Sequence, residues 1–466
     1  MEGWSGVVLA GGKGTRMRSQ VPKVLHPLCG MPMVCLVVEA LREVGTATPV
    51  VVVPPQAQAY REALGDSVRY AEQREARGTG DAVAAALQAL DEGATHLLVV
   101  NGDLPLIRPE TLRELMMLHL AQAADLTFVT AHGTPGQALG RVIRDGSGAP
   151  VGIVEAAQAS EVIGETKVER QKEGGRALTE VNVGVYCLRA TWAKEAIASL
   201  RPSSGGEVYL TSLVESGWRR GARIATKTLE DPQEGMGVNT RVELAQAEAV
   251  MRQRVREHWM LQGVSMMDPA TVYIDRQVTI GPDTLLYPHT FLLGKTSVGA
   301  GCAIGPSTIL RDSTVGDECK VEASVVEGAV LEAGVDVGPF SHLRPETYVE
   351  AGVHIGNYAE VKKSRVGRGV KMGHFSYVGD AFIGANVNIG AGTITCNFDG
   401  VEKHQTVVEE DVFLGSDTLL VAPVRVGAGA ATGAGSVVVR DVPPGTLVVG
   451  MPARVVRSRK APESKT

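Results

Sequence analysis

Apolar residues recur at every sixth position in the carboxyl-terminal part of the chain. The clearest run is Ile280, Leu286, Leu292, Val298, Ile304 and Leu310. A period near 3.6 residues indicates a helix and a period of two indicates a strand, whereas a period of six indicates a short strand and a turn repeated in stacked coils. Glycine often follows the apolar residue, as at Gly281 and Gly299, and provides tight corners. The pattern predicts a solenoid of short strands.

This solenoid resembles the left-handed parallel β-helix of hexapeptide-repeat proteins. The rhythm covers residues 268–455, enough for about ten coils if each takes about eighteen residues. The alternative, a set of unrelated sandwich strands, does not predict so regular a spacing.

The amino-terminal half has a different pattern. Short Val/Leu-rich runs at 6–10, 50–53, 96–100 and 126–130 alternate with helical stretches at 32–44, 79–90 and 109–120. This alternation predicts a Rossmann-like α/β domain with a mostly parallel sheet. Residues 241–261 contain no Gly or Pro and place Val242, Ala245 and Ala249 at helical spacing. We therefore expect an α/β domain at 1–240, a linker helix at 241–262, and a β-helix at 263–466 with a basic tail.

Composition limits the possible partners. The formal net charge of the 466 residues is −6, which gives no reason to expect nucleic acid as a partner, and no apolar stretch predicts a membrane segment or a signal peptide. The six cysteines show no zinc spacing, which indicates reduced thiols. We expect a cytoplasmic protein.

A glycine-rich loop follows the first predicted strand. Residues 9–17 read Leu-Ala-Gly-Gly-Lys-Gly-Thr-Arg-Met, and Pro22-Lys23 comes shortly after. Backbone N–H groups of such a loop close around phosphates, and Lys13, Arg16 and Lys23 add positive charge. The loop is neither a Walker A motif nor a dinucleotide fingerprint, because Gly14 stands where Ser or Thr is required and Met17 stands at the third glycine position.

This loop resembles the signature of sugar-1-phosphate nucleotidylyltransferases. Asp103, which follows the 96–100 strand, lies where a carboxylate can hold Mg²⁺ on a triphosphate. By the resemblance, Gln73 reads a pyrimidine edge and Asn239 is the second Mg²⁺ ligand. The residues that the resemblance assigns to UTP and the sugar phosphate are Leu9, Ala10, Gly11, Gly12, Lys23, Gln73, Gly78, Thr79, Asp103, Gly140, Glu155, Asn182 and Asn239.

The expected reaction is an in-line attack of a sugar-1-phosphate oxygen on the α-phosphorus of a nucleoside triphosphate. The nucleophile is already an anion, so no acid or base is strictly required. Mg²⁺, Lys23 and Arg16 would supply positioning and charge neutralisation.

Charged residues interrupt the six-residue rhythm in the second half. An amine that attacks a thioester must be neutral, so a base with a pKa near 7 is wanted, and His374 is the candidate. A loop of about ten residues after Asn397 breaks the hexads before Val407.

Together these segments resemble the acetyltransferase half of the family of bifunctional N-acetylglucosamine-1-phosphate uridylyltransferase/glucosamine-1-phosphate N-acetyltransferase enzymes. The resemblance spans residues 6–455. It implies that Glu360 orients His374, that Arg344 and Lys362 bind the sugar phosphate, and that Tyr377 and Asn388 contact the sugar. The remaining positions implied for substrate or acetyl-CoA are Ala391, Asn397, Phe398, Ser416 and Ala434.

Four positions depart from the family pattern. Phe398 replaces a common Tyr, which removes one hydroxyl contact to the sugar. Met451 stands where an Arg often meets the CoA phosphates, and Arg440, Arg454 or Arg457 could substitute for it or could belong to a solvated tail. Leu139 and Asn101 replace aromatic residues, which changes packing more than chemistry.

Two other functions are compatible with parts of this pattern. One is a single-activity sugar-1-phosphate nucleotidylyltransferase with a structural or regulatory β-helix, and the other is a non-catalytic regulatory subunit with decayed sites. His374, Lys362 and the Asn397 loop argue against the first, while Lys23, Asp103 and Asn239 argue against the second. The leading expectation is an enzyme that uses acetyl-CoA and UTP to make UDP-N-acetylglucosamine for cell-wall precursors. By resemblance we expect a homotrimer with acetyltransferase sites shared between neighbours.

Overall fold

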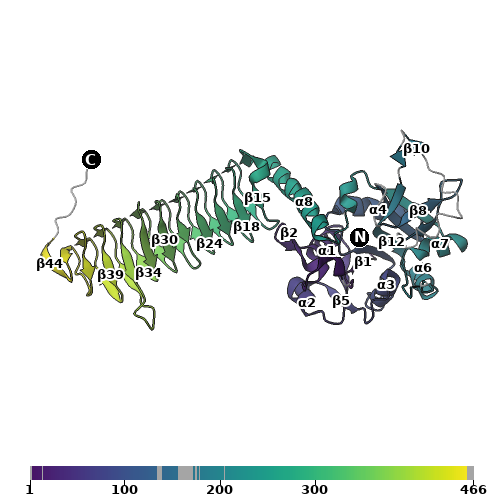
Figure 1. Ribbon diagram of the computed structural model, residues 1–466, viewed down its shortest axis with the longest axis horizontal. Helices are drawn as coiled ribbons and strands as arrows, with labels where there is room; N and C mark the ends of the chain where they lie inside the picture. Colours follow the sequence, from purple (N-terminus) through teal and green to yellow (C-terminus); the bar gives the residue numbers. More distant parts are fainter. Residues whose placement is uncertain are drawn as a thin grey trace. The chain divides into compact units, whose positions relative to one another are not determined.

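The computed structural model describes residues 3–458 apart from 13, 134–138, 156–171, 174–175, 178 and 204. The chain forms two compact units, residues 1–251 and 252–466. Lys13 of the glycine-rich loop and the end of the basic tail lie outside the described residues. Figure 1 shows an α/β unit and a solenoid of short strands.

The first unit is built on one mixed sheet. Its strand order is β13 (Ile224–Thr228), β7 (Leu126–Gly133), β12 (Thr179–Arg189), β6 (His96–Asn101), β1 (Trp4–Leu9), β4 (Ala47–Val53) and β5 (Arg69–Glu72). Strand β12 runs antiparallel to both of its neighbours, and the other pairs along this path are parallel. Strands β8 (Arg141–Arg144) and β9 (Pro150–Val154) extend from β12 as an antiparallel pair. The predicted, mostly parallel sheet is confirmed.

Helices cover both faces of this sheet, because successive strand residues point to opposite sides. Val8 and Leu98 join one core with α1 (Met33–Glu43) and α4 (Pro109–Ala121). Val7 and Leu97 join another with α3 (Thr79–Leu87) and α6 (Ala190–Ala198). The other elements are α2 (Gln58–Leu64), α7 (Ser212–Arg219), η1 (Thr15–Met17), η2 (Lys23–Leu25), η3 (Gly65–Ser67), η4 (Pro232–Gly235), β2 (Pro27–Leu28), β3 (Met31–Pro32), β10 (Lys172–Glu173) and β11 (Arg176–Ala177).

Helix α8 spans Arg241–Leu261, and the two units divide within it. The helix forms where the sequence predicts it, but its buried side differs from the apolar positions that suggested it. Ala247, Met251 and Val255 are buried and lie four residues apart, whereas Val242 is 68% exposed. Spacing of four places the buried residues on one face.

The second unit is a parallel β-helix with three sides, and the hexad residues from Ile280 to Leu310 are buried in it. The first side contains β14 (Ser265–Met266), β17 (Leu285–Leu286), β20 (Ala303–Ile304), β23 (Lys320–Val321), β26 (Asp336–Val337), β29 (His354–Ile355), β32 (Lys371–Met372), β35 (Asn388–Ile389), β38 (Phe413–Leu414), β41 (Ala431–Thr432), β43 (Thr446–Gly450) and β44 (Ala453–Ser458). The second side contains β15 (Tyr273–Ile274), β18 (Phe291–Leu293), β21 (Ile309–Arg311), β24 (Val325–Glu327), β27 (His342–Leu343), β30 (Ala359–Lys362), β33 (Ser376–Gly379), β36 (Ile394–Cys396), β39 (Leu419–Val421) and β42 (Val437–Val438). The third side contains β16 (Thr279–Ile280), β19 (Ser297–Val298), β22 (Thr314–Val315), β25 (Val330–Leu331), β28 (Tyr348–Val349), β31 (Arg365–Val366), β34 (Ala381–Ile383), β37 (Thr406–Val408) and β40 (Val424–Val426).

One coil is longer than the others. Leu285 pairs with Ala303, 18 residues further on, whereas Asn388 pairs with Phe413, 25 residues further on. The extra residues form a loop between β36 and β37, which projects from the solenoid near β34 in Figure 1. This is the loop that the sequence places after Asn397.

Hydroxyl side chains fill positions inside the corners that the apolar pattern does not describe. Thr290, Thr296 and Ser313 are buried and donate to backbone carbonyls three, three and two residues earlier. Buried polar atoms need such partners. The start of the tail forms β44 (Ala453–Ser458), which pairs with β43, while the side chains of residues 454–458 are exposed.

Candidate functional site

The glycine-rich loop starts where three strands end. The carbonyl of Leu9 accepts a hydrogen bond from Gly102 N–H at 2.9 Å, and Ala10 N–H donates to Val52 at 2.9 Å. The phenol of Tyr60 donates to the carbonyl of Ala10 at 3.1 Å, and burial raises the pKa of Tyr60 to about 12. The start of the loop is therefore fixed at the carboxyl end of the sheet, where ligands bind in α/β folds.

Gln73 lies beside this loop with its amide oriented by the protein. It is 7% exposed, and its Nε2 donates to the Gly78 carbonyl at 3.0 Å and to Asp81 at 2.9 Å. Its Oε1 faces Gly11, where a Cβ atom would approach it to 2.7 Å. A side chain at position 11 would therefore collide with the Gln73 amide oxygen, whereas a Cβ on Gly12 would meet nothing within 4 Å.

Gly14 brings Lys23 to the loop. Gly14 has a φ of +58°, and a Cβ there would lie 2.6 Å from the Cβ of Lys23. Only glycine combines this backbone conformation with so close an approach.

The Lys23 ammonium joins the two residues that the sequence predicts as metal ligands. Its Nζ makes a short ion pair with Asp103 and donates to Asn239 Oδ1 at 2.9 Å. The guanidinium of Arg16 donates to the same Asn239 oxygen at 3.0 Å. The structure thus brings Arg16, Lys23, Asp103 and Asn239 together from four separate segments.

Asn239 is held by the start of α8. The hydroxyl of Thr240 accepts from Glu243 N–H, and the Glu243 carboxylate accepts from the N–H groups of Thr240 and Asn239, each at 2.8 Å. This is a capping box extended by one residue. In addition, Val238 N–H donates to the Asp103 carbonyl at 2.9 Å. The Asn239 and Asp103 segments are therefore fixed to each other by backbone as well as by Lys23.

The Gly78–Thr79 segment packs against the chain before α7. Gly78 has a φ of +104°, and a Cβ there would lie 2.6 Å from the Val208 carbonyl oxygen. The hydroxyl of Thr79 accepts from Leu210 N–H at 3.0 Å. These contacts place the segment next to Gln73.

The residues predicted for the sugar form a second group in this unit. Gly140 accepts from Asn182 N–H at 2.8 Å, and a Cβ on Gly140 would lie 3.6 Å from a Glu155 oxygen. Glu155 accepts from Thr211 at 2.5 Å, and Asn182 Nδ2 donates to Tyr186 at 2.7 Å.

Asn101, one of the departures, fits against a glycine in this group. A Cβ on Gly184, whose φ is +95°, would lie 2.2 Å from Asn101 Nδ2. Asn101 therefore occupies space that Gly184 leaves open.

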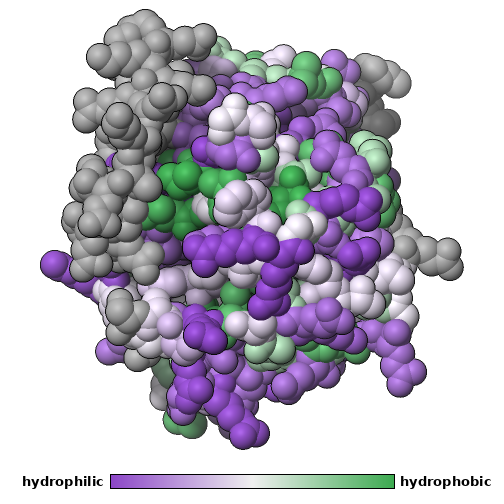
Figure 2. Space-filling view, turned by 90° about the vertical axis from the view of Figure 1, so that its right-hand side faces the viewer, coloured by the Kyte–Doolittle hydropathy of each residue, from purple (hydrophilic) through white to green (hydrophobic). Residues whose placement is uncertain are grey.

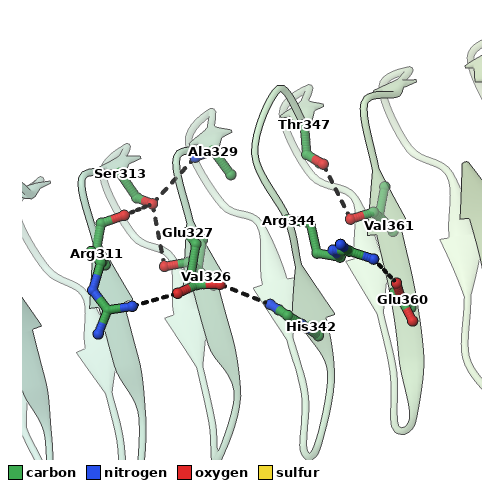
Figure 3. A network of polar contacts seen from close by, with 10 residues as sticks. All are labelled: Arg311, Ser313, Val326, Glu327, Ala329, His342, Arg344, Thr347, Glu360 and Val361. Carbon is green, nitrogen blue, oxygen red and sulfur yellow. Dashed lines mark hydrogen bonds and ion pairs between the residues drawn. The ribbon is translucent and has the colours of Figure 1, made fainter. Parts of the chain in front are cut away.

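In the β-helix, charged residues lie along its second side. Arg344 Nη1 donates to Glu360 Oε1 at 2.8 Å, as Figure 3 shows. Glu327, one coil before Arg344, contacts both Arg311 of the preceding coil and His342 of the following coil. Among the described residues Glu360 makes no hydrogen bond to His374, and its carboxylate pairs with Arg344 instead.

Lys403, which the sequence reasoning did not single out, lies beside Lys362. The neighbouring Lys403 ammonium, with a smaller effect from Arg344, lowers the pKa of Lys362. The only available signal in the sequence was that Lys403 belongs to the loop that breaks the hexads. Arg344, Lys362 and Lys403 together make a concentration of positive charge able to hold a phosphate.

The loop after β36 is tied to the same place. Asn397 is 6% exposed, donates to Tyr377 at 3.4 Å, and makes a short hydrogen bond to Asp380, another residue that the sequence reasoning missed. The carboxylate of Asp399 accepts from backbone N–H groups and from His404, which lowers its pKa. Phe398, the next residue, is 58% exposed.

His374 lies at a different corner, where the first side turns into the second. Backbone hydrogen bonds stack the coils here: Gly392 to Phe375 at 2.7 Å, Asp417 to Ala391 at 2.6 Å, and Gly435 to Ser416 at 2.8 Å. They place His374, Ala391, Ser416 and Ala434 in one column. Asn388 precedes this corner in β35, and the backbone N–H of Ala391 makes no hydrogen bond in the described part of the chain. We call this set the histidine column.

The column and the cationic cluster are separated within one chain. The turn that carries His374 comes before β33, whereas Lys362 and the Asn397 loop lie where the second side turns into the third. Strand β33 alone spans about 10 Å between them. Tyr377, in that strand, contacts Asn397 and so leans away from His374.

Exposed aromatic rings line the corner of the histidine column. Phe340 and Tyr358 are 58% and 62% exposed and stack with ring centroids 5.4 Å apart, and Phe375 is 57% exposed one coil later. We call these three residues the aromatic ridge.

On the face seen in Figure 2, hydrophilic residues cover most of the area and hydrophobic residues appear in small separate areas. No helix that the structure describes is long and apolar enough to cross a membrane. Nor do three or more His, Cys, Asp or Glu side chains gather into a metal site among the described residues.

Comparison with known proteins covers nearly the whole chain. Residues 6–179 match the family model of the MobA-like NTP transferase domain. The chain is 44% identical over 462 residues to "Bifunctional protein GlmU" of Pelobacter propionicus, which covers 98% of each protein. It is 43% identical over 444 residues to the protein of the same name from Heliobacterium modesticaldum, which covers 95% of this chain and 94% of the relative.

Proposed function

The chain belongs to the GlmU family of bifunctional proteins, and from this premise we propose a specific division of labour between its two units. Residues 1–240 transfer UMP from UTP to N-acetylglucosamine 1-phosphate and release pyrophosphate. Residues 263–466 transfer the acetyl group of acetyl-CoA to glucosamine 1-phosphate, which supplies the first reaction. The product, UDP-N-acetylglucosamine, serves cell-wall synthesis in the cytoplasm.

The observation that carries the first activity is the meeting of Arg16, Lys23, Asp103 and Asn239 at the carboxyl end of the sheet. In the reaction an oxygen of the sugar phosphate bonds to the α-phosphorus while the bond to the β-phosphate oxygen breaks. Negative charge grows on the pyrophosphate and on the α-phosphoryl oxygens. Cations fixed beside those oxygens stabilise the transition state more than the substrates.

Asp103 and Asn239 would hold Mg²⁺. One ammonium contacts an oxygen of each residue, so one divalent cation can reach both, and two protein oxygens plus phosphate oxygens suit Mg²⁺. When bound, the ion supplies charge neutralisation on the phosphates. With Asp103 and Asn239 holding the ion, the Lys23 ammonium would be available to a phosphate oxygen.

Gln73 supports the choice of uracil. Its Nε2 is already used by Gly78 and Asp81, so the group left to face the loop is the acceptor Oε1. Uracil presents a donor at N3 and cytosine presents an acceptor. A fixed acceptor therefore favours the uracil ring.

Gly140, Glu155 and Asn182 form the pocket for the sugar in this proposal. Gly140 precedes β8, Glu155 follows β9, and Asn182 lies in β12, which pairs with β6, the strand that Asp103 follows. A sugar held there would present its phosphate to the α-phosphorus.

In the second activity the amine nitrogen bonds to the thioester carbon and the CoA thiolate leaves. His374 accepts the proton that the nitrogen loses, and the N–H of Ala391 is placed to donate to the carbonyl oxygen. Acetyl-CoA would run along the histidine column past Ser416 and Ala434. Arg344, Lys362 and Lys403 would bind the sugar phosphate, with Tyr377, Asn388, Asn397 and Phe398 around the sugar.

A homotrimer would bring these groups together. The base and the cationic cluster lie at opposite ends of β33, too far apart for one small sugar phosphate, and the aromatic ridge beside the base is exposed. Burying a side chain of this size stabilises an interface by about 1.5–3 kcal/mol. The proposal is that the ridge packs on a neighbour, whose cationic cluster then meets His374.

Two assays test the proposal. One measures CoA thiol release from acetyl-CoA and glucosamine 1-phosphate, and the other measures pyrophosphate release from UTP and N-acetylglucosamine 1-phosphate with Mg²⁺. Both must be positive for the wild-type chain. A chain that released pyrophosphate but no CoA thiol would favour the alternative of a scaffold β-helix.

A further inference from the structure

The buried imidazole of His26 links the two segments that carry Lys23 and Asn239. His26 is 5% exposed and follows η2, in which Lys23 is the first residue. Its Nδ1 lies 3.3 Å from Nη1 of Arg241, the first residue of α8. Because a guanidinium can only donate, Nδ1 is the acceptor of this hydrogen bond.

The link closes a ring of contacts. Lys23 donates to Asn239, Asn239 is two residues before Arg241, and Arg241 donates to His26, three residues after Lys23. The side-chain contact of Lys23 with Asn239 is thus supported by a second contact between the same two segments. That second contact lies outside the set of residues proposed to touch substrate.

From this geometry we infer that His26 is a positioning residue for nucleotidyl transfer, which sets the turn carrying Lys23 against the helix start carrying Asn239 through its hydrogen bond with Arg241. The inference rests on the proposed function. In this proposal neither His26 nor Arg241 contacts substrate.

Burial and charge around His26 agree with an accepting nitrogen. Burial lowers the pKa of His26, the positive charge of Arg241 lowers it further, and a backbone hydrogen bond with Val21, the smallest of the three causes, raises it. The backbone of His26 is held independently, since its N–H donates to Lys23 and its carbonyl accepts from Met33. Loss of the ring alone therefore leaves the turn itself folded and removes only the contact that sets the turn against α8.

The expected consequence is kinetic. A displacement of about 1 Å in a group that acts in the transition state costs up to about 100-fold in rate. Arg16, Lys23 and Asn239 act on charge that develops during the reaction, so kcat falls more than KM rises. The pocket proposed for the sugar does not include this link, so the KM for N-acetylglucosamine 1-phosphate stays within about twofold.

The test compares His26→Leu, His26→Asn and Arg241→Gln in the full-length chain. Asn carries an oxygen on Cγ, where His carries Nδ1, and so keeps an acceptor for Arg241. We expect kcat for pyrophosphate release to fall about tenfold in His26→Leu and in Arg241→Gln, and to be largely restored in His26→Asn. Combining His26→Leu with Arg241→Gln should add little, because both remove one hydrogen bond.

The chain offers two controls. Acetyl transfer by the same molecules should stay within about twofold of wild type, which shows that the β-helix is folded, and the unchanged KM for N-acetylglucosamine 1-phosphate shows that the α/β unit is folded. His119→Leu removes another buried histidine of the same unit, one that contacts Thr127 and not Arg241, and should leave kcat unchanged. Arg241 is exposed, so Arg241→Gln should not disturb the core. This variant therefore tests the role of the hydrogen bond even if a change of the buried His26 ring prevents folding.

The inference is overturned if Arg241→Gln keeps wild-type kcat, or if His26→Asn is as impaired as His26→Leu. It is also overturned if the KM for the sugar phosphate changes as much as kcat. A wild-type chain that releases no pyrophosphate would instead overturn the proposed function, so the two failures are distinguishable.

Discussion

The two candidate sites are built on opposite plans. In the α/β unit, side chains from the loop after β1, η2, the end of β6 and the segment before α8 meet directly, and Lys23 contacts both Asp103 and Asn239. In the β-helix, the proposed base His374 and the cations Lys362 and Lys403 occupy different corners of one solenoid.

The difference follows from topology. Parallel strands with crossover helices bring the loops at one edge of a sheet together, so a single chain can complete a site there. A solenoid stacks equivalent positions along each corner, as it does for Ala391 and Ser416, but it keeps different corners apart. We therefore propose that the first site is complete within one chain and that the second is completed by a neighbour.

The largest expected effects test whether the sites are independent. Asp103→Ala should lower pyrophosphate release by about 1,000-fold, since it removes the carboxylate among the groups proposed to hold Mg²⁺ and phosphate. His374→Ala should lower acetyl transfer by about 100-fold or more, because a general base contributes about 10²–10⁴. Each variant should keep the other activity, as measured by the paired assays. Loss of both activities from either change would contradict independent sites.

The next effect tests whether only the second site needs a neighbour. Phe340→Glu places a charge on the aromatic ridge, next to the ring of Tyr358. We expect sedimentation to show smaller species, acetyl transfer to fall at least about tenfold, and pyrophosphate release to remain, because burying an unpaired charge in an interface is costly. Trp218→Glu, at another exposed aromatic residue, is the matched control. Full acetyl transfer by a stable monomer would refute the shared site.

A smaller effect concerns specificity in the self-contained site. Gln73→Leu removes the oriented acceptor next to Gly11, and should lower kcat/KM for UTP by about 10–100-fold, the range of one or two hydrogen bonds. Competition between UTP and CTP measures the loss of discrimination. Unchanged preference for UTP would exclude Gln73 as the reader of the base.

The smallest effect separates the stabilities of the two units. Burial, with a smaller contribution from the nearby His96, lowers the pKa of His119 to about 4. The folded protein keeps this ring neutral while the unfolded chain takes up a proton below pH 6.5, so the unit loses up to about 3 kcal/mol as pH falls from 6.5 to 4. Calorimetry should show the α/β unit melting earlier in acid, and His119→Gln should reduce that shift. The corners of the β-helix bury hydroxyl groups such as Thr290, which do not titrate in this range.

The sequence predicted most of the fold because two periodicities are local. The hexad run identified buried positions such as Leu286 and Leu310, and the alternation of apolar runs with helices identified the α/β unit. It did not predict which face of α8 is buried, or that the tail continues as β44, because both depend on partners distant in sequence.

The candidate site was predictable where motifs carry it and not where tertiary contacts do. The glycine-rich loop, Asp103 and Asn239 could be named, but their joint contact with Lys23 could not. Lys403 and the His26–Arg241 hydrogen bond were missed, since neither residue stands out until the fold places it.

Subunit complementation tests the central comparison most directly. His374→Ala and Lys362→Ala chains, each inactive in acetyl transfer, are unfolded and refolded together, and CoA thiol release is measured. If neighbours complete the site, mixed assemblies contain some sites with both residues intact, and acetyl transfer should recover to well above either parent. The same mixing of Asp103→Ala with Lys23→Ala should recover no pyrophosphate release, because those residues must come from one chain. No recovery in the first mixture, or clear recovery in the second, would contradict the account.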